Sequence, residues 1–280
     1  MPELPEVETI KRAVEAALKE AVIERVTVKQ PCLRQNIPTD FAQQITGARI
    51  RTFERKAKYM LMHLDNGKTV IWHFGMSGKI KIESATTPNE PQKHDHVILE
   101  TSKGRLIYND PRRFGLIALC DTTNWRKNPL FINLGPDPWD ESFSPDYLAA
   151  KLANKKTTIK VALLDQTIVC GIGNIYASEI LYLARIRPDR TAESISAAEI
   201  KQLIKRTRQV LQQAIEAGGS SIHDYVHPDG DIGYFQESHC VYNKIGLRCP
   251  QCRCNFAKTG GIKKIVLGGR STFYCDTLQK

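Results

Sequence analysis

The sequence predicts an α+β protein. Its N-terminal half is expected to be an antiparallel β-sandwich with one leading helix, and its C-terminal half a helical domain that ends in a small β-hairpin module. Three observations predict this class. Apolar residues recur at helical spacing near the N-terminus, several hairpin turn signals follow, and a Pro- and Gly-rich break at 134–138 precedes a second stretch of helical periodicity.

The leading helix is expected over residues 5–20, where Val7, Ile10, Val14 and Leu18 would share one face. Pro5 suits the first turn, because the N–H that proline lacks has no partner there. The early glutamates complement the helix dipole. The helix should therefore bury one apolar stripe.

Strand signals occupy residues 49–120. The triplet Asp65-Asn66-Gly67 is a strong hairpin turn between two strand regions. A second hairpin is expected to turn at Ser102-Lys103-Gly104, and a last strand is expected over 116–120. These segments indicate a sandwich or barrel of antiparallel strands.

The break at 134–138 divides the chain. The expected segments are a β-sandwich domain over 1–135, a linker over 136–142, a helical domain over 143–238 and a hairpin module over 239–280. Residues 219–238 form a long Gly-, Asp- and Ser-rich loop. Loops of that length are more often functional than idle.

Composition excludes two classes of protein. The 280 residues are 41% hydrophobic and 25% charged, which is ordinary for a globular protein and excludes a largely disordered chain. No apolar run approaches the roughly 18 residues of a membrane-spanning helix. The acidic, proline-containing N-terminus is unlike a signal peptide. We therefore expect a cytoplasmic protein with no membrane partner.

The charge is concentrated near the C-terminus. The chain carries a net charge of +10, and residues 239–280 hold eight Lys or Arg against one acid, a net +7. A basic stripe of this kind is typical of a polyanion ligand, usually nucleic acid. An ordinary basic surface is the alternative.

The eight cysteines should be mostly reduced in the cytoplasm. Cys32, Cys120 and Cys170 have apolar neighbours and are expected to be buried small residues. The other five are crowded into the basic tail, which suggests a metal rather than disulfides. They are Cys240, Cys249, Cys252, Cys254 and Cys275.

The N-terminus offers a nucleophile. Removal of Met1 before the small Pro2 would leave a free secondary amine, and an α-amino group titrates near about 8, against about 10.4 for Lys. Its attack on an aldehydic carbon gives an iminium, an electron sink that permits elimination. Glu3 and Glu6 lie within reach to move protons. On the chemistry alone, a proline at a frayed helix end is the simpler interpretation.

Seven motifs occur in one order along the chain. They are MPELPEVETI at 1–10, KAKY at 56–59, HFGMSG at 73–78, HDH at 94–96, NDPRRFG at 109–115, GIGNIYASE at 171–179 and GRSTFYC at 269–275. In that order and over the whole chain, they resemble the bacterial formamidopyrimidine-DNA glycosylases, also called 8-oxoguanine DNA glycosylases.

The resemblance implies a bifunctional DNA glycosylase and AP lyase that removes oxidised purines. Pro2 would form a Schiff base with C1′ of the damaged nucleotide, and Glu3 would be the general acid–base. Lys58 would assist β-elimination and hold a phosphate. Arg270, at a finger tip, would act in δ-elimination and in phosphate clamping.

The resemblance also implies DNA contacts. Met76, Arg112 and Phe114 would fill the void left by an extruded base, although core packing is the alternative for Met76 and Phe114. Residues 171–179 would belong to a helix-two-turn-helix, and residues 218–235 would cover the flipped base. The further expected contacts are His94, Arg113, Lys155, Lys156 and Asn174.

The C-terminal module departs from the family. Cys249 and Cys252 form a zinc knuckle and Cys275 adds a third thiolate, but Leu278 stands where the family has its fourth cysteine. Cys254 is a possible fourth ligand, as are His239, Cys240 and Asp276. Alternatively, the hairpin has lost its metal and is held by apolar packing. One Zn²⁺ per chain is expected.

Two other functions stay open. An endonuclease VIII-type enzyme would use the same amine on oxidised pyrimidines, and a non-cleaving relative would only bind damaged DNA. Leu4 and the Met76, Arg112 and Phe114 trio favour the purine enzyme. The expected partner is double-stranded DNA with oxidised bases or abasic sites. The expected form is a monomer in the bacterial cytoplasm, at the nucleoid.

Overall fold

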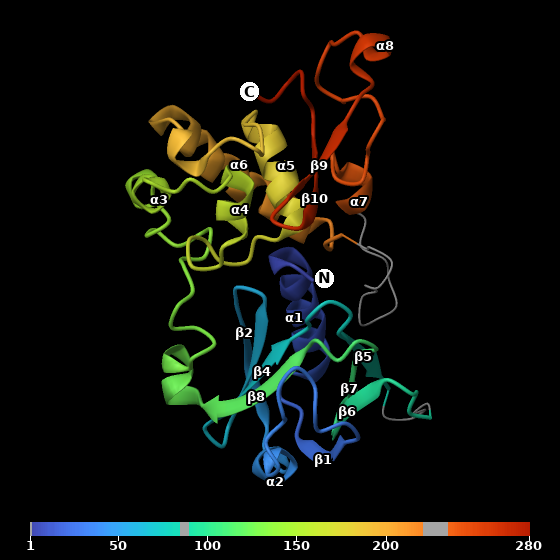
Figure 1. Ribbon diagram of the computed structural model, residues 1–280. Coiled ribbons are helices and arrows are strands. Elements are labelled where there is room, and N and C mark those ends of the chain that lie inside the picture. Colours follow the sequence, from blue (N-terminus) through green and yellow to red (C-terminus); the bar gives the residue numbers. More distant parts are fainter. Residues whose placement is uncertain (1, 85–89, 221–234) are drawn as a thin grey trace. The chain divides into compact units, whose positions relative to one another are not determined.

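The computed structural model describes residues 2–84, 90–220 and 235–280. The chain divides into two compact units. Unit 1 consists of Met1–Ile132 with Ala217–Gln236, and unit 2 of Asn133–Glu216 with Glu237–Lys280. Figure 1 shows the elements of both units along the chain.

Unit 1 contains one leading helix and two four-stranded antiparallel sheets. One sheet has the order β2-β3-β4-β8 and the other the order β1-β6-β7-β5. The bounds are α1 Leu4–Leu18, β1 Ile23–Val28, α2 Phe41–Ile45, β2 Ile50–Lys56, β3 Tyr59–Leu64, β4 Lys68–His73, β5 Lys79–Glu83, β6 Asp95–Thr101, β7 Gly104–Asn109, β8 Leu116–Asp121 and the 3₁₀ helix Thr122–Lys127.

One apolar cluster holds unit 1 together. Ile10, Val14 and Leu18 of α1 enter it with side chains from both sheets, and Trp72 of β4 lies against Tyr108 of β7 with ring centroids 5.8 Å apart. Burying such side chains is the main free energy that favours a fold of this size. The structure thus confirms the predicted helix and antiparallel sandwich.

Unit 2 is helical and ends in a two-stranded hairpin. Its helices are α3 Pro145–Leu152, α4 Ile159–Leu164, α5 Asn174–Ala184, a 3₁₀ turn Ala192–Ser194, α6 Ala197–Glu216 and α8 Phe256–Thr259. Its strands are β9 Lys263–Leu267 and β10 Arg270–Tyr274. The short helix α7, Phe235–Ser238, straddles the division of the chain between the two units.

The hairpin turns at two glycines. Gly268 and Gly269 have φ of 54° and 70°, and Leu267 pairs with Arg270 across them. A two-residue turn with both φ positive matches the twist of the flanking strands and favours glycine. It sets Arg270 at the exposed start of β10.

Two details differ from the sequence predictions. Cys32 is exposed and Cys120 is half-buried, whereas Cys170 is buried as predicted. Cys32 lies in the loop after β1, where its apolar neighbours Pro31 and Leu33 do not enclose it.

Among the helices in the described parts of the chain, none combines the length and apolarity needed to span a bilayer.

Candidate functional site

The N-terminal residues are fixed by the start of α1. Glu3 is the N-cap of this helix, and its backbone N–H donates to Glu6 Oε2 at 2.9 Å in a capping box. Glu6 Oε1 accepts from the N–H of Ser220 at 2.8 Å. Both glutamates are 2% exposed. Pro2, also buried, is therefore held next to a firmly capped helix rather than at a frayed end.

Lys58 lies in the two-residue turn between β2 and β3. Ala57, with φ of 52°, makes this tight turn, and Lys58 is 8% exposed. Arg55 of β2 donates to Glu8 of α1 at 3.2 Å, which ties the turn to the leading helix. Burial raises the pKa of Glu8, but Lys11, Arg12 and Arg55 outweigh burial and hold that pKa below its usual range.

His73 ends β4 beside this turn, and its spacing in the sequence did not predict an individual role for it. Its ring lies 4.8 Å from that of Tyr59, and its Nδ1 accepts from the N–H of Gly75 at 3.1 Å. Burial, with the nearby charges of Lys58 and Arg34, lowers the pKa of His73 to about 4. Neutral His73 with Nδ1 occupied carries its proton on Nε2. The Nε2–H group of His73 can therefore donate a hydrogen bond to an anion that is also attracted by Lys58 and Arg34.

Asp110 joins the turn that carries Met76 to the turn that carries Phe114. Its Oδ1 accepts from Ser77 Oγ at 2.6 Å and its Oδ2 from the N–H of Gly115 at 2.8 Å. Asp110 is fully buried. The structure assigns it a positioning role that spacing alone did not reveal, because its partners lie on two separate segments.

Glycine lets the two turns touch. A Cβ on Gly75, where φ is 57°, would lie 2.4 Å from the carbonyl carbon and oxygen of Phe114. Met76 and Phe114 are 40% and 47% exposed, so neither packs in the core of the protein. The Arg112 guanidinium lies 4.8 Å from the centre of the Phe114 ring. The structure thus presents an exposed thioether, guanidinium and ring on joined turns.

The remaining candidates of unit 1 flank this cluster. His94 is half-buried just before β6, and its carbonyl accepts from the N–H of Asp110 at 3.1 Å. Arg113 is exposed and has φ of 56°. Such a conformation is uncommon for a side chain of this size and marks a shaped turn. The candidate lesion loop at 218–235 falls mostly outside the described residues.

In unit 2, a buried lysine links Asn174 to the finger hairpin. Lys160 is fully buried, and its Nζ donates to Asn174 Oδ1 at 2.5 Å and to Thr272 Oγ1 at 2.7 Å. Asn174 is the first residue of α5, and its Nδ2 donates to the carbonyl of Ser271 at 3.0 Å. Arg270 starts the same strand, so the helix N-terminus and the candidate finger tip are held together.

Lys160 was missed because its neighbours Lys155 and Lys156 dominate the local charge pattern. Lys156 is exposed, and Lys155 lies 3.9 Å from Asp165. A lysine flanked by Ile159 and Val161 on a short helix is a signal of burial that could have separated it from them.

Three thiols gather in the C-terminal module. The Sγ atoms of Cys249, Cys252 and Cys275 all lie within 4.8 Å of one another. The N–H of Cys252 lies 3.3 Å from Cys249 Sγ, and the Tyr182 hydroxyl is also 3.3 Å from that sulfur. These contacts suit thiolates that bind a metal, because hydrogen-bond donors beside a metal ligand hold it in orientation.

These three thiols leave one position of a four-ligand zinc site to be supplied by another residue. Leu278 packs against the apolar cluster that contains Cys249 and Cys275. Cys254 Sγ lies 2.9 Å from Cys252 Sγ and 3.3 Å from the hydroxyl of Thr259. The residues present therefore fit three metal ligands, with Cys254 adjacent to one of them.

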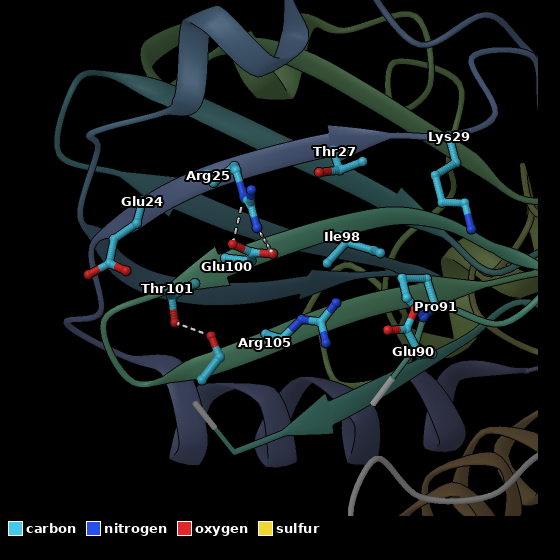
Figure 2. Close-up of a pocket in the computed structure, with 11 residues that line it drawn as sticks. Glu24, Arg25, Thr27, Lys29, Glu90, Pro91, Ile98, Glu100, Thr101 and Arg105 are labelled. Carbon is cyan, nitrogen blue, oxygen red and sulfur yellow. Dashed lines mark hydrogen bonds and ion pairs between the residues drawn. The ribbon is translucent and has the colours of Figure 1, made fainter. Parts of the chain in front are cut away.

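The N-terminal unit also has a polar hollow of about 500 Å³ on the sheet formed by β1, β6, β7 and β5. Figure 2 shows the ion pair there between Arg25 and Glu100, whose nitrogen and oxygen atoms lie 2.7 Å apart. None of the candidate site residues lines this hollow. Arg25 and Glu100 neutralise each other there, and Arg105 forms an ion pair with Glu83 at 3.1 Å.

Comparison with known proteins decides the family. A model of the formamidopyrimidine-DNA glycosylase N-terminal domain matches residues 1–117, and a model of the H2TH domain of these enzymes matches residues 134–226. The formamidopyrimidine-DNA glycosylase of Rhodospirillum rubrum is 43% identical over 281 residues, covering 100% of both chains. The chain belongs to the formamidopyrimidine-DNA glycosylase family.

Other members agree. The formamidopyrimidine-DNA glycosylase of Acidiphilium cryptum is 45% identical, again over 100% of both chains. The structure is similar to that of a Lactococcus lactis family member in complex with DNA containing Fapy-dG, with a TM-score of 0.89, 33% identity and 100% of both chains covered. The Thermus thermophilus member gives a TM-score of 0.87 at 34% identity, over 99% of this chain and 98% of that one.

Proposed function

We propose that the chain is a DNA glycosylase with AP lyase activity, which removes oxidised purines from double-stranded DNA. Family membership over the full length carries this proposal. The capped, buried N-terminus supports it, because a catalytic amine must be held in a defined position. The Lactococcus lactis relative has been solved with Fapy-dG-containing and with abasic DNA.

In the proposed reaction, the Pro2 amine attacks C1′ of the damaged nucleotide and the base leaves. Opening of the sugar ring at O4′, whose oxygen takes up a proton, converts this C1′ adduct into an iminium. The iminium acidifies C2′, and loss of that proton breaks the C3′–O bond. Glu3 moves protons at the sugar. Lys58 and Arg270 are cations that balance the charge of the phosphates. A second elimination then breaks the bond to the phosphate on the 5′ side, which leaves a one-nucleotide gap.

Extruding the base leaves a void in the duplex that the protein must fill. We assign this role to Met76, Arg112 and Phe114, since an exposed ring with a guanidinium at 4.8 Å can stack where a base was. The DNA backbone would be contacted by further side chains from both units. These are His94, Arg113, Lys155, Lys156 and Asn174, to which we add His73.

The proposed organisation is the β-sandwich at 1–135, the linker at 136–142, the helix-two-turn-helix domain at 143–238 and the finger at 239–280. We further propose a monomer that works in the bacterial cytoplasm on nucleoid DNA, in line with its bacterial relatives.

Oxidised pyrimidines are a second candidate substrate, because a Lactococcus lactis relative has been solved with DNA that contains an oxidised pyrimidine. End-labelled duplexes with 8-oxoguanine or with an oxidised pyrimidine test the choice. We expect the purine to be excised at least about tenfold faster, a difference of about 1.4 kcal/mol in transition-state binding. Faster loss of the pyrimidine would favour an endonuclease VIII-type enzyme, and binding without cleavage would favour a non-enzymatic binder.

We propose that the C-terminal module holds one Zn²⁺ through Cys249, Cys252, Cys275 and Cys254. A structural zinc site takes four Cys or His ligands. The proximity of Cys254 to Cys252 supports it as the fourth ligand. The ion would lock the module, while Ile262 and Phe273, which are 1% and 5% exposed, pack beside it.

Metal analysis of the purified protein should give one zinc per chain, and Cys254→Ser should lose zinc to a chelator at least about tenfold faster. The matched control is Cys240→Ser, because the Cys240 sulfur faces the carbonyl of Ser238 at 4.0 Å, whereas Cys254 Sγ lies 2.9 Å from Cys252 Sγ. Thermal unfolding should move with zinc content. Absence of zinc from an unaltered protein that still cleaves DNA would refute the metal site and leave apolar packing to hold the hairpin.

A further inference from the structure

A second hollow lies in unit 2, between the segment that leads into α3 and the long helix α6. Its volume is about 630 Å³, within the range of sites that hold a ligand group. Buried Phe143 and Ile204 line it, together with Pro145 and with Trp139, which is 38% exposed. A large aromatic side chain left half in solvent at the edge of an apolar hollow is a typical anchor for a partner.

Three cations of α6 line the same hollow. Lys201, Lys205 and Arg208 follow at intervals of four and three residues, so they share one face of the helix over roughly 10 Å. Glu141 is the one acid that lines the hollow. In the part of the chain that the structure describes, neither Lys201 nor Lys205 forms an ion pair.

Arg208 shapes the hollow. Its guanidinium donates to the carbonyl oxygens of Pro138 at 2.8 Å and Phe143 at 3.2 Å, which holds the segment that carries Trp139 against α6. Those partners are neutral, so the positive charge of Arg208 adds to that of the two lysines. The hollow therefore combines an apolar interior with a surplus of positive charge.

We propose that this hollow docks an acidic peptide segment of a partner protein. An apolar side chain of the segment would pack on Trp139 and Phe143, and its carboxylates would pair with Lys201 and Lys205. Such a peptide matches both the apolar interior and the positive charge of the hollow. The interaction is separate from the proposed DNA repair, because the hollow shares no residue with the candidate DNA contacts of unit 2.

The observations favour a peptide over a nucleic acid. Binding of a single strand relies on successive bases stacked on several aromatic side chains, whereas Trp139 is the one exposed aromatic among the residues that line the hollow. The aliphatic surfaces of Ile204 and Pro145 fit a side chain better than a base edge. Positive charge alone would attract either partner, so both belong in the test.

The test is fluorescence anisotropy with the full chain and a labelled peptide of four acidic residues followed by Leu-Phe. We expect saturable binding that weakens with salt. Trp139→Ala should reduce the affinity at least about tenfold, and so should the double variant Lys201→Glu, Lys205→Glu. The lysines are exposed, so the double variant will fold even if Trp139→Ala does not.

Charge reversal gives the decisive control. A peptide with four lysines before Leu-Phe should bind the double variant and not the unaltered protein. The matched control is Lys19→Glu, Lys103→Glu, which makes the same charge change at exposed sites of unit 1 and should leave peptide binding intact. The double variant and the matched control should excise a lesion at the unaltered rate.

Two results would overturn the proposal. One is absence of peptide binding at about 1 mM, the weakest affinity of interest. The other is loss of binding to a single-stranded or lesion-containing oligonucleotide in the double variant with peptide binding unchanged. That second result would make the hollow a nucleic-acid surface.

Discussion

Blocking the Pro2 amine is expected to abolish both strand cleavage and covalent trapping on abasic DNA in the presence of borohydride. The iminium requires a free amine, and a retained Met1 would convert the Pro2 nitrogen into an amide. We expect at least about a 10³-fold loss of lyase rate, in the range seen when a covalent nucleophile is removed. Pro2→Gly should retain partial activity, because a primary amine still forms an imine.

The measurement compares trapped complex on a gel for protein with a processed N-terminus and protein with Met1 retained. Binding to a non-cleavable abasic analogue serves as the control and should change less than the lyase rate. Efficient trapping by protein with Met1 retained would show that another amine, such as that of Lys58, is the nucleophile.

Replacing Asp110 with Ala is expected to impair lesion excision by about 10²-fold, the cost of misplacing groups by about 1 Å. Its carboxylate joins the turns of Met76 and Phe114 through Ser77 and the Gly115 N–H. Removal leaves buried donors unpaired, at about 1–3 kcal/mol of stability each. The void-filling side chains would then lose their fixed positions.

A preformed abasic site has no base to extract, so lyase activity there should fall less than about tenfold. Arg112→Ala is the companion variant, because it removes an exposed guanidinium without touching the buried carboxylate. It should lower excision of a paired lesion with no change in thermal stability. Equal losses on paired-lesion and abasic substrates would contradict the void-filling role.

The structure changes how the C-terminal module should be tested. Three backbone N–H groups at Cys240, Val241 and Tyr242 donate to buried Glu179 of α5 at 2.7–3.0 Å. Deleting the module would leave the Glu179 carboxylate without these three donors and would expose Tyr182, so unit 2 would lose stability. Point variants such as Cys254→Ser separate the role of the module in DNA contact from its role in folding.

Local features of the sequence sufficed for much of the fold. The apolar stripe of α1, the turn at Asp65-Asn66-Gly67 and the proline break near 134–138 each act within about one turn or hairpin, so spacing and residue type reveal them. The knuckle at Cys249 and Cys252 is likewise local. The order of motifs along the chain indicated the family.

Tertiary structure alone decided which distant groups meet. Glu6 accepts from Ser220, Asp110 joins two turns, and Lys160 is buried between Asn174 and Thr272. These contacts link residues far apart in the sequence: 33 residues separate Asp110 from Ser77, 112 separate Lys160 from Thr272, and 214 separate Glu6 from Ser220. A lysine or carboxylate can be buried only where the folded chain brings partners to it, because the free-energy cost of burying an unpaired charge is too large.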